Sequence, residues 1–293
     1  MYGRRVEVTI GKAGEPGRKW TSARGVDSLR ITFDVARTDD EEPNQGTVTL
    51  TNLAADTRDW LDEHGQVLIL GAGYGDTAGQ IWTADIARVE HRRQGQEWTT
   101  TIEGGDTELA ISTAQINRSF SAGTPYAVMA SALVDALGVS LGYAPPQFLA
   151  ARSVRGTTLK GPAVDRLREF AESQGFRLTI QDGVAYVFAE GTGVDRVALL
   201  LGPDAGLQTS PSRLRSEQDD GTAARRGRRQ QREALPKVEF VAMMDGRLAP
   251  ARRVQFRGTA HDGVWVVTRC RFEGDSWSGA YGVTCEAVAT VAT

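Results

Sequence analysis

Residues 67–89 read VLILGAGYGDTAGQIWTADIARV, and their three closely spaced glycines resemble a cofactor-binding turn. A dinucleotide-binding turn has the spacing G-x-G-x-x-G, and a helix begins at its last glycine. Here the glycines stand at every second position, as Gly71, Gly73 and Gly75, and apolar and polar side chains alternate over residues 81–89. Alternation with period two is typical of a half-buried strand. The stretch therefore predicts two strands joined by a turn, and no nucleotide site.

The same alternation appears on both sides of this stretch. One face of SLRITFDVAR (residues 28–37) is apolar and the other is polar, and residues 46–53 and 97–102 repeat the pattern. A short polar segment, residues 52–65, instead has apolar side chains at helical spacing. Several antiparallel strands with one short helix predict a compact β-barrel or sandwich over residues 1–111.

The central part of the chain, residues 112–190, has a different pattern. Residues 122–139 and 160–175 carry apolar side chains at the spacing of amphipathic helices. Two short strands follow, joined by QDG at residues 181–183, which is a strong tight-turn signal. Strand patterns then return over residues 191–293. The predicted fold class is α+β, mainly β: two antiparallel β-barrels or sandwiches with a small helix–helix–hairpin module between them.

The last strands contain both cysteines of the chain. If the final turn is centred on DSWSGA (residues 275–280), Cys270 and Cys285 stand opposite each other on an apolar inner face. The N-terminal residues MYGRRVEVTI lack the apolar region of a signal peptide, so we expect synthesis and folding in a cytoplasm. In that compartment two reduced, buried thiols are favoured over a disulfide, which the register would also allow.

Composition and charge argue against several functional classes. The 293 residues carry a net charge of −3, which disfavours a globally basic nucleic-acid binder. Two cysteines and three scattered histidines give no metal-ligand spacing, and no catalytic motif is present. Asp85 and Asp106 are the carboxylates best placed for acid–base work, although such residues more often cap turns or pair with arginine. The sequence therefore predicts no enzyme, no catalytic, cofactor or metal residue, and no membrane segment.

An arginine-rich segment, residues 213–237, is the best candidate for a partner contact. Its centre has almost no apolar side chains and carries five arginines: Arg225, Arg226, Arg228, Arg229 and Arg232. Such a run cannot bury a core and is expected to be a solvated loop. Two functional interpretations stand beside plain solvation: a contact arm for an acidic patch on a neighbouring subunit or partner, and a salt-sensitive contact with DNA phosphates.

The order of segments resembles the baseplate hub proteins of phages, the family that includes late-control protein D of contractile-tailed phages. The opening strand, loop and strand of residues 30–61 are similar to the start of that family. LGAGYGDTAGQIWTADIARVEHRRQGQEWTTTIEGGD (residues 70–106) resembles the section that closes its first barrel. LKGPAVDRLREFAESQG (residues 159–175) resembles its helical module, and residues 269–288 resemble the final hairpin of its second barrel.

This resemblance implies a structural role in a virion tail. Three chains, each with two barrels similar to the tail-tube fold, would form a homotrimeric ring that matches a hexameric tube on one side and a trimeric spike on the other. The implied partners are the tail tube protein or tube initiator, the central spike protein, the tape measure protein and the surrounding baseplate or wedge proteins. The central channel would pass the tape measure and DNA without sequence-specific nucleic-acid binding. The implied location is the tail baseplate, assembled in the host cytoplasm.

Two other functions stay open at this point. A carbohydrate-binding tail module would carry clustered aromatic side chains on an exposed face, whereas Trp82 and Trp98 fall on alternating strands and fit a core or interface better. A cell-wall hydrolase would need a pocket with a pair of carboxylates.

Overall fold

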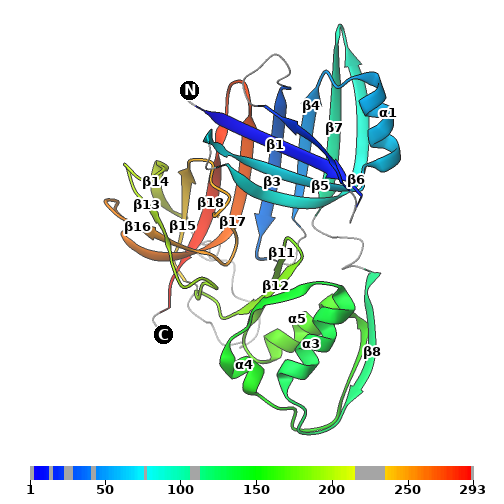
Figure 1. The fold of residues 1–293 in the computed structure, drawn as a ribbon. Coiled ribbons are helices and arrows are strands. Elements are labelled where there is room, and N and C mark those ends of the chain that lie inside the picture. The colour runs from blue at the N-terminus through cyan, green and yellow to red at the C-terminus, as the bar shows by residue number, and fades with distance from the viewer. Residues whose placement is uncertain are drawn as a thin grey trace, which may run out of the picture.

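The computed structural model describes residues 3–12, 16–22, 29–40, 44–75, 78–105, 113–214 and 235–291. Antiparallel strands dominate these residues, and a few short helices accompany them (Figure 1). The predicted class, α+β and mainly β, is confirmed. No helix within the described ranges is long and apolar enough to cross a membrane.

The described residues of the N-terminal part contribute seven strands to a large sheet and also form one α-helix. In chain order these are β1 (Arg4–Gly11), β2 (Arg18–Thr21), β3 (Ile31–Thr38), β4 (Gln45–Thr51), α1 (Ala55–His64), β5 (Val67–Tyr74), β6 (Gly79–Gln94) and β7 (Glu97–Gly105). As the alternation predicts, β5 and β6 are antiparallel neighbours, with Leu70 of β5 opposite Trp82 of β6. After Gly75 the chain returns as a strand, since β6 begins at Gly79. Gly73 is required by close packing, since a Cβ atom there would lie 2.5 Å from the Cα of Ala78.

The C-terminal part extends the same sheet. Its strands are β13 (Leu199–Leu201), β14 (Leu207–Leu214), β15 (Lys237–Ala242), β16 (Arg253–Phe256), β17 (Gly263–Asp275) and β18 (Tyr281–Ala289). The second half of β17 pairs with β3, which joins the two parts into one 13-stranded sheet. Around that seam Phe33, Val35 and Phe272 belong to a single hydrophobic core that runs through both parts. The division into residues 1–111, 112–190 and 191–293 stays a prediction.

The final hairpin has the register expected from the sequence. Cys270 of β17 lies opposite Cys285 of β18, with the two Sγ atoms 3.4 Å apart. Both are free thiols, fully buried in the core. Burial and the neighbouring sulfur raise the pKa of Cys285 well above its ordinary value, so this thiol stays protonated.

The central module has its own core. Its elements are β8 (Gln115–Phe120), α3 (Tyr126–Leu137), β9 (Ser140–Tyr143), α4 (Pro146–Ala150), β10 (Thr157–Pro162), α5 (Ala163–Ser173), β11 (Arg177–Gln181) and β12 (Val184–Phe188). Tyr126, Phe148 and Phe170 pack ring against ring between its helices. The predicted pair of helices and hairpin are present, and the structure adds the pairing of β8 with β10 and of β9 with β12.

Candidate assembly site at the junction of sheet and module

The partner-contact residues predicted from the sequence lie outside the described residues. This holds for Arg225, Arg226, Arg228, Arg229 and Arg232, and also for the carboxylate Asp106. Asp85 lies on β6 between Gly105 and Val67, and partial burial raises its pKa. Among the residues that the structure describes, no cluster of three or more histidine, cysteine or acidic side chains could hold a metal ion.

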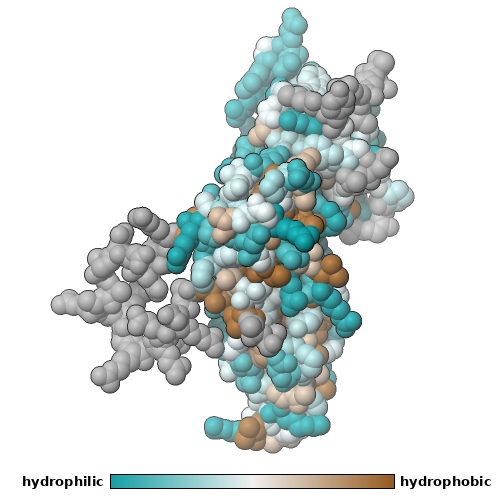
Figure 2. All heavy atoms as spheres, turned by 90° about the vertical axis from the view of Figure 1, so that its left-hand side faces the viewer, coloured by the Kyte–Doolittle hydropathy of each residue, from teal (hydrophilic) through white to brown (hydrophobic). Residues whose placement is uncertain are grey.

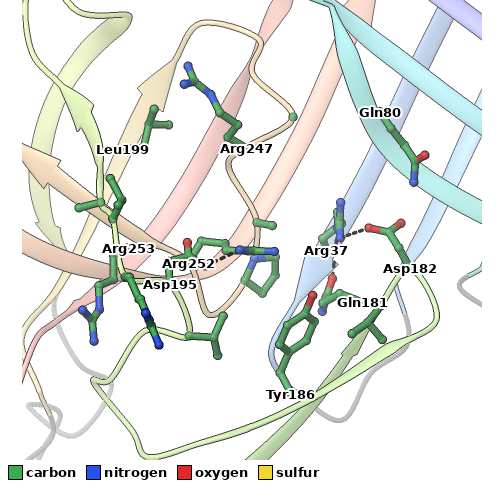
Figure 3. Close-up of a pocket in the computed structure, with 18 of the residues that line it drawn as sticks. Arg37, Gln80, Gln181, Asp182, Tyr186, Asp195, Leu199, Arg247, Arg252 and Arg253 are labelled. Carbon is green, nitrogen blue, oxygen red and sulfur yellow. Dashed lines mark hydrogen bonds and ion pairs between the residues drawn. The ribbon is translucent and has the colours of Figure 1, made fainter. Parts of the chain in front are cut away.

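A hollow lies on the described surface where the module meets the sheet. It has a volume of about 1030 Å³ and is open to solvent (Figure 3). Three segments supply most of its lining: the hairpin β11–β12, residues 194–200, which run into β13 and are called the strap, and residues 246–253, which end at the start of β16. Arg37 of β3 and Gln80 of β6 complete the lining. We call this hollow the junction groove. Its charged lining consists of Arg37, Asp182, Asp195, Arg196, Arg247, Arg252 and Arg253.

Arg37 anchors the inner wall of the groove. It lies on β3, and its guanidinium donates to the carbonyl oxygen of Ile81 at 2.7 Å, to Asp182 Oδ2 at 2.6 Å and to Gln181 Oε1 at 3.2 Å (Figure 3). Its side chain is only 4% exposed. A buried cation is tolerated when its hydrogen bonds are made, and here the partners come from both the sheet and the module. Arg37 therefore fixes the module hairpin against the sheet.

Gln181 extends this network behind the groove. Its side-chain amide donates to the carbonyl oxygen of Thr38 and to Thr179 Oγ1, both at 2.8 Å. Its oxygen accepts a further hydrogen bond from Asn44 Nδ2 at 2.9 Å. All these side chains are buried. Because every hydrogen bond of the network has a direction, it gives the junction a more defined geometry than an apolar contact would.

A second ionic contact crosses the junction beside this network. Arg177 of β11 lies 3.0 Å from Asp40 Oδ1 and 3.6 Å from Asp39 Oδ1. Asp39 is buried, and the loss of hydration raises its pKa to about 6; the nearby Asp40 adds to this shift, whereas Arg177 opposes it. The junction therefore contains one carboxylate that titrates near neutral pH.

The outer rim of the groove carries the remaining arginines. Arg252 pairs with Asp195, and its guanidinium lies over the ring of Tyr186 at 5.7 Å. Arg253 donates to the carbonyl oxygen of Gly193 at 3.3 Å.

Two further rim arginines reach into solvent. Arg247 pairs with Asp245 at 2.6 Å but leaves 74% of its side chain exposed. Arg196 is also exposed, on the strap. The lining holds five arginines and two aspartates, and with Asp245, the partner of Arg247, the formal excess is two positive charges. This arrangement suits an acidic protein surface and provides neither a nucleophile with its base nor a carboxylate pair for hydrolysis.

Apolar side chains accompany the rim charges. Val197 is 80% exposed and Leu200 is 44% exposed. Figure 2 views the molecule from the side of β13 and β16 and shows apolar surface among polar surface there. β13 pairs with β16 on one side only, so within the described sheet its other edge is open. Exposed apolar groups beside arginines and an open strand edge are typical of a protein contact surface.

The outer face of the sheet is polar where β17, β3, β4 and β7 lie side by side. A row across these strands runs through Glu273, Asp34, Thr47 and Glu103, which are in register. Arg271 forms a bidentate pair with Asp34 in a shallow depression on this face. This face has the composition of a surface in contact with water rather than of a second core.

The aromatic residues singled out in the sequence do not form a sugar-binding platform. Trp82 is buried in the core, and the guanidinium of Arg58 covers Trp98 at 4.1 Å from its ring centre. Trp277 is 59% exposed, on the final hairpin.

Sequence reasoning missed the junction groove. Its wall residues Arg37 and Asp182 are 145 positions apart in the chain. One signal was available: Arg37 continues the apolar face that Ile31, Phe33 and Val35 form on β3. A charged residue in an apolar register indicates a buried partner.

The fold belongs to the class seen in phage tail proteins and in components of type VI secretion systems. No protein-family model matches the chain, and no curated protein matches it in sequence. The likeness to solved structures is therefore one of fold.

The 43 kDa tail protein of prophage MuSo2 from Shewanella oneidensis is similar over 98% of both chains, with a TM-score of 0.62 and 10% identity. A tail protein from Neisseria meningitidis MC58 is similar over 98% of this chain and 97% of its own, with a TM-score of 0.59 and 13% identity. The E. coli c3393 protein, a type VI secretion component with structural similarity to the T4 tail proteins gp27 and gp5, matches 92% of this chain and 76% of its own, with a TM-score of 0.53 and 12% identity.

Proposed function

We propose that this chain is a structural baseplate hub of a phage or phage-derived tail. Three copies form a ring that joins the hexameric tail tube to the trimeric spike and leaves a central channel. The observation that carries the proposal is the match of fold over 98% of this chain and 97–98% of two tail proteins, one of them from a prophage. A match over whole chains includes the module as well as the sheet, so it covers the complete arrangement rather than a common β-sandwich.

Two features of the structure support the ring. The continuous sheet holds the two β-rich parts in a fixed relation through the pairing of β3 with β17. Rigid coupling is what a subunit needs if its two halves are to occupy equivalent positions in a six-fold arrangement. The polar face of β17, β3, β4 and β7 supplies a hydrated surface that could line a channel. The proposed partners are the tube protein and a spike protein; two of the solved structures of similar fold are complexes that contain VgrG.

The proposal assigns the protein no catalytic activity. The junction groove contains arginines and two paired aspartates in place of a carboxylate pair across a sugar. The tail baseplate is the proposed location.

The mass of the purified protein in solution tests the proposal. Light scattering is expected to give about 95 kDa, three times the chain mass of 31.6 kDa, either alone or after addition of the adjacent spike protein. Electron micrographs of that species should show a ring with a central opening. A monomer with and without the spike protein would contradict the hub.

A further inference from the structure

One helix carries a charge opposite to that of the junction groove. The solvent-facing side of α1 presents Asp56, Asp59, Asp62 and Glu63, all exposed. The positive residue of this helix, Arg58, turns inward: its guanidinium lies over Trp98 and donates to the carbonyl oxygen of Leu53 at 2.5 Å. The outward face of α1 is therefore acidic. We call these four side chains the acidic face.

The acidic face and the outer rim of the junction groove lie toward opposite ends of the sheet. α1 packs beside β2, where Trp60 contacts Trp20 and Arg18 lies over the Trp60 ring. β2 is the last strand at one end of the sheet order, whereas β13 and β16 branch from β17 toward the other end. In Figure 1, α1 lies at the right and β13 and β16 lie at the left. One copy cannot bring its own acidic face to its own groove.

We propose that the acidic face of α1 in one copy docks on the junction groove of a second copy, at the arginine rim formed by Arg196, Arg247, Arg252 and Arg253. This inference rests on the proposed ring and specifies its contact. The rim has capacity for new partners, because Arg196 is exposed, Arg247 leaves 74% of its side chain exposed beside its partner Asp245, and the lining holds an excess of positive charge. Docking also covers Val197 and Leu200, the exposed apolar side chains of the strap and β13.

The contact is directional, since each copy donates a helix to one neighbour and a groove to the other. A head-to-tail contact of this kind closes into a ring when its rotation permits. Charge pairing at the rim sets orientation and speeds association, and salt screens it over about 8–10 Å. Association is therefore expected to weaken as ionic strength rises.

Charge reversal tests the contact. Arg196→Glu with Arg247→Glu makes the rim acidic, and Asp56→Lys with Asp59→Lys makes the helix basic. Each double variant should associate at least about tenfold more weakly than the natural chain in sedimentation velocity, because like charges then face each other. A chain with all four substitutions should recover association, since both surfaces are reversed together. Circular dichroism and thermal melting check that each variant is folded.

A matched control uses the module. Arg155→Glu with Lys160→Glu makes the same change in net charge as the rim variant, Arg196→Glu with Arg247→Glu. Its positions are exposed and lie away from both surfaces, so association should be unchanged. Ring formation that survives either reversal overturns the docking while the hub stands. Loss of ring formation without recovery in the fourfold variant also overturns it. A natural chain that stays monomeric at all salt concentrations, with and without the spike protein, overturns both proposals.

Discussion

Arg37 and Asp182 form an ion pair of 2.6 Å between a strand of the sheet and the hairpin of the module. The arginine is buried and the aspartate is partly buried, so each compensates the other in a place where water is scarce. Asp182 also accepts a hydrogen bond from the backbone N–H of Thr83 on β6, at 3.1 Å. One carboxylate thereby connects the module to two strands of the sheet.

Removal of this cation should destabilise the protein strongly. Arg37→Met keeps the apolar stem but leaves Asp182 without its charge partner, and the expected loss is about 3 kcal/mol of unfolding free energy. Urea denaturation at pH 7 measures it. The control is Arg271→Met, which breaks an exposed pair with Asp34 and should cost less than about 1 kcal/mol. Equal losses in both variants would contradict the structural role of Arg37.

Asp39 should make stability depend on pH. Its folded-state pKa of about 6 lies above the ordinary value of 3.8, so between these values the folded chain binds more protons than the unfolded chain. Stability from this group is present below pH 3.8, falls as the pH rises to about 6 and stays reduced above it. Asp39→Asn mimics the protonated form.

The Asp39→Asn chain should therefore be more stable than the natural chain at pH 7–8, by about 1–3 kcal/mol, and equally stable near pH 4. Denaturation curves at four pH values from 4 to 8 provide the comparison. A difference in stability that does not change with pH would show that Asp39 ionises normally in the folded chain.

Tyr281 connects the final hairpin to the N-terminal strands. Its hydroxyl lies 2.7 Å from the carbonyl oxygen of Gly73 and 2.9 Å from that of Arg5, and it accepts a hydrogen bond from the Gly73 N–H. Burial raises the pKa of Tyr281 to about 12. Tyr281→Phe removes these hydrogen bonds of the hydroxyl and should cost about 0.5–1.5 kcal/mol in thermal or urea unfolding. Tyr143→Phe, at an exposed position, should cost almost nothing.

Gly73 should tolerate no side chain. An added Cβ would meet the backbone of Ala78 at 2.5 Å, so Gly73→Ala must separate β5 from β6 and should cost about 1–3 kcal/mol. The control is Gly79→Ala, where no atom lies within 4 Å of the added Cβ. That variant should match the natural chain or gain about 0.5 kcal/mol. Similar melting temperatures for the two variants would contradict the close approach of the strands.

Local patterns in the sequence were sufficient to predict the elements themselves. Period-two alternation placed β3, β5 and β6, and helical spacing placed α3 and α5. The register of Cys270 against Cys285 followed from a short turn, because a hairpin brings near neighbours in the chain together. The arginine-rich segment was also evident, although its residues Arg225–Arg232 lie outside the described part of the chain.

The tertiary structure alone decided how distant segments combine. The pairing of β3 with β17 joins residues more than 200 positions apart, and the contact of Arg37 with Asp182 spans 145 positions. Periodicity shows which face of a strand is buried but not which strand lies beside it, because every apolar strand presents a similar edge. The sequence by itself therefore determined a mainly β chain with a helical module. The junction groove arose only when the fold brought together charges that lie far apart along the chain, and the fold also decided where the acidic face of α1 lies relative to that groove.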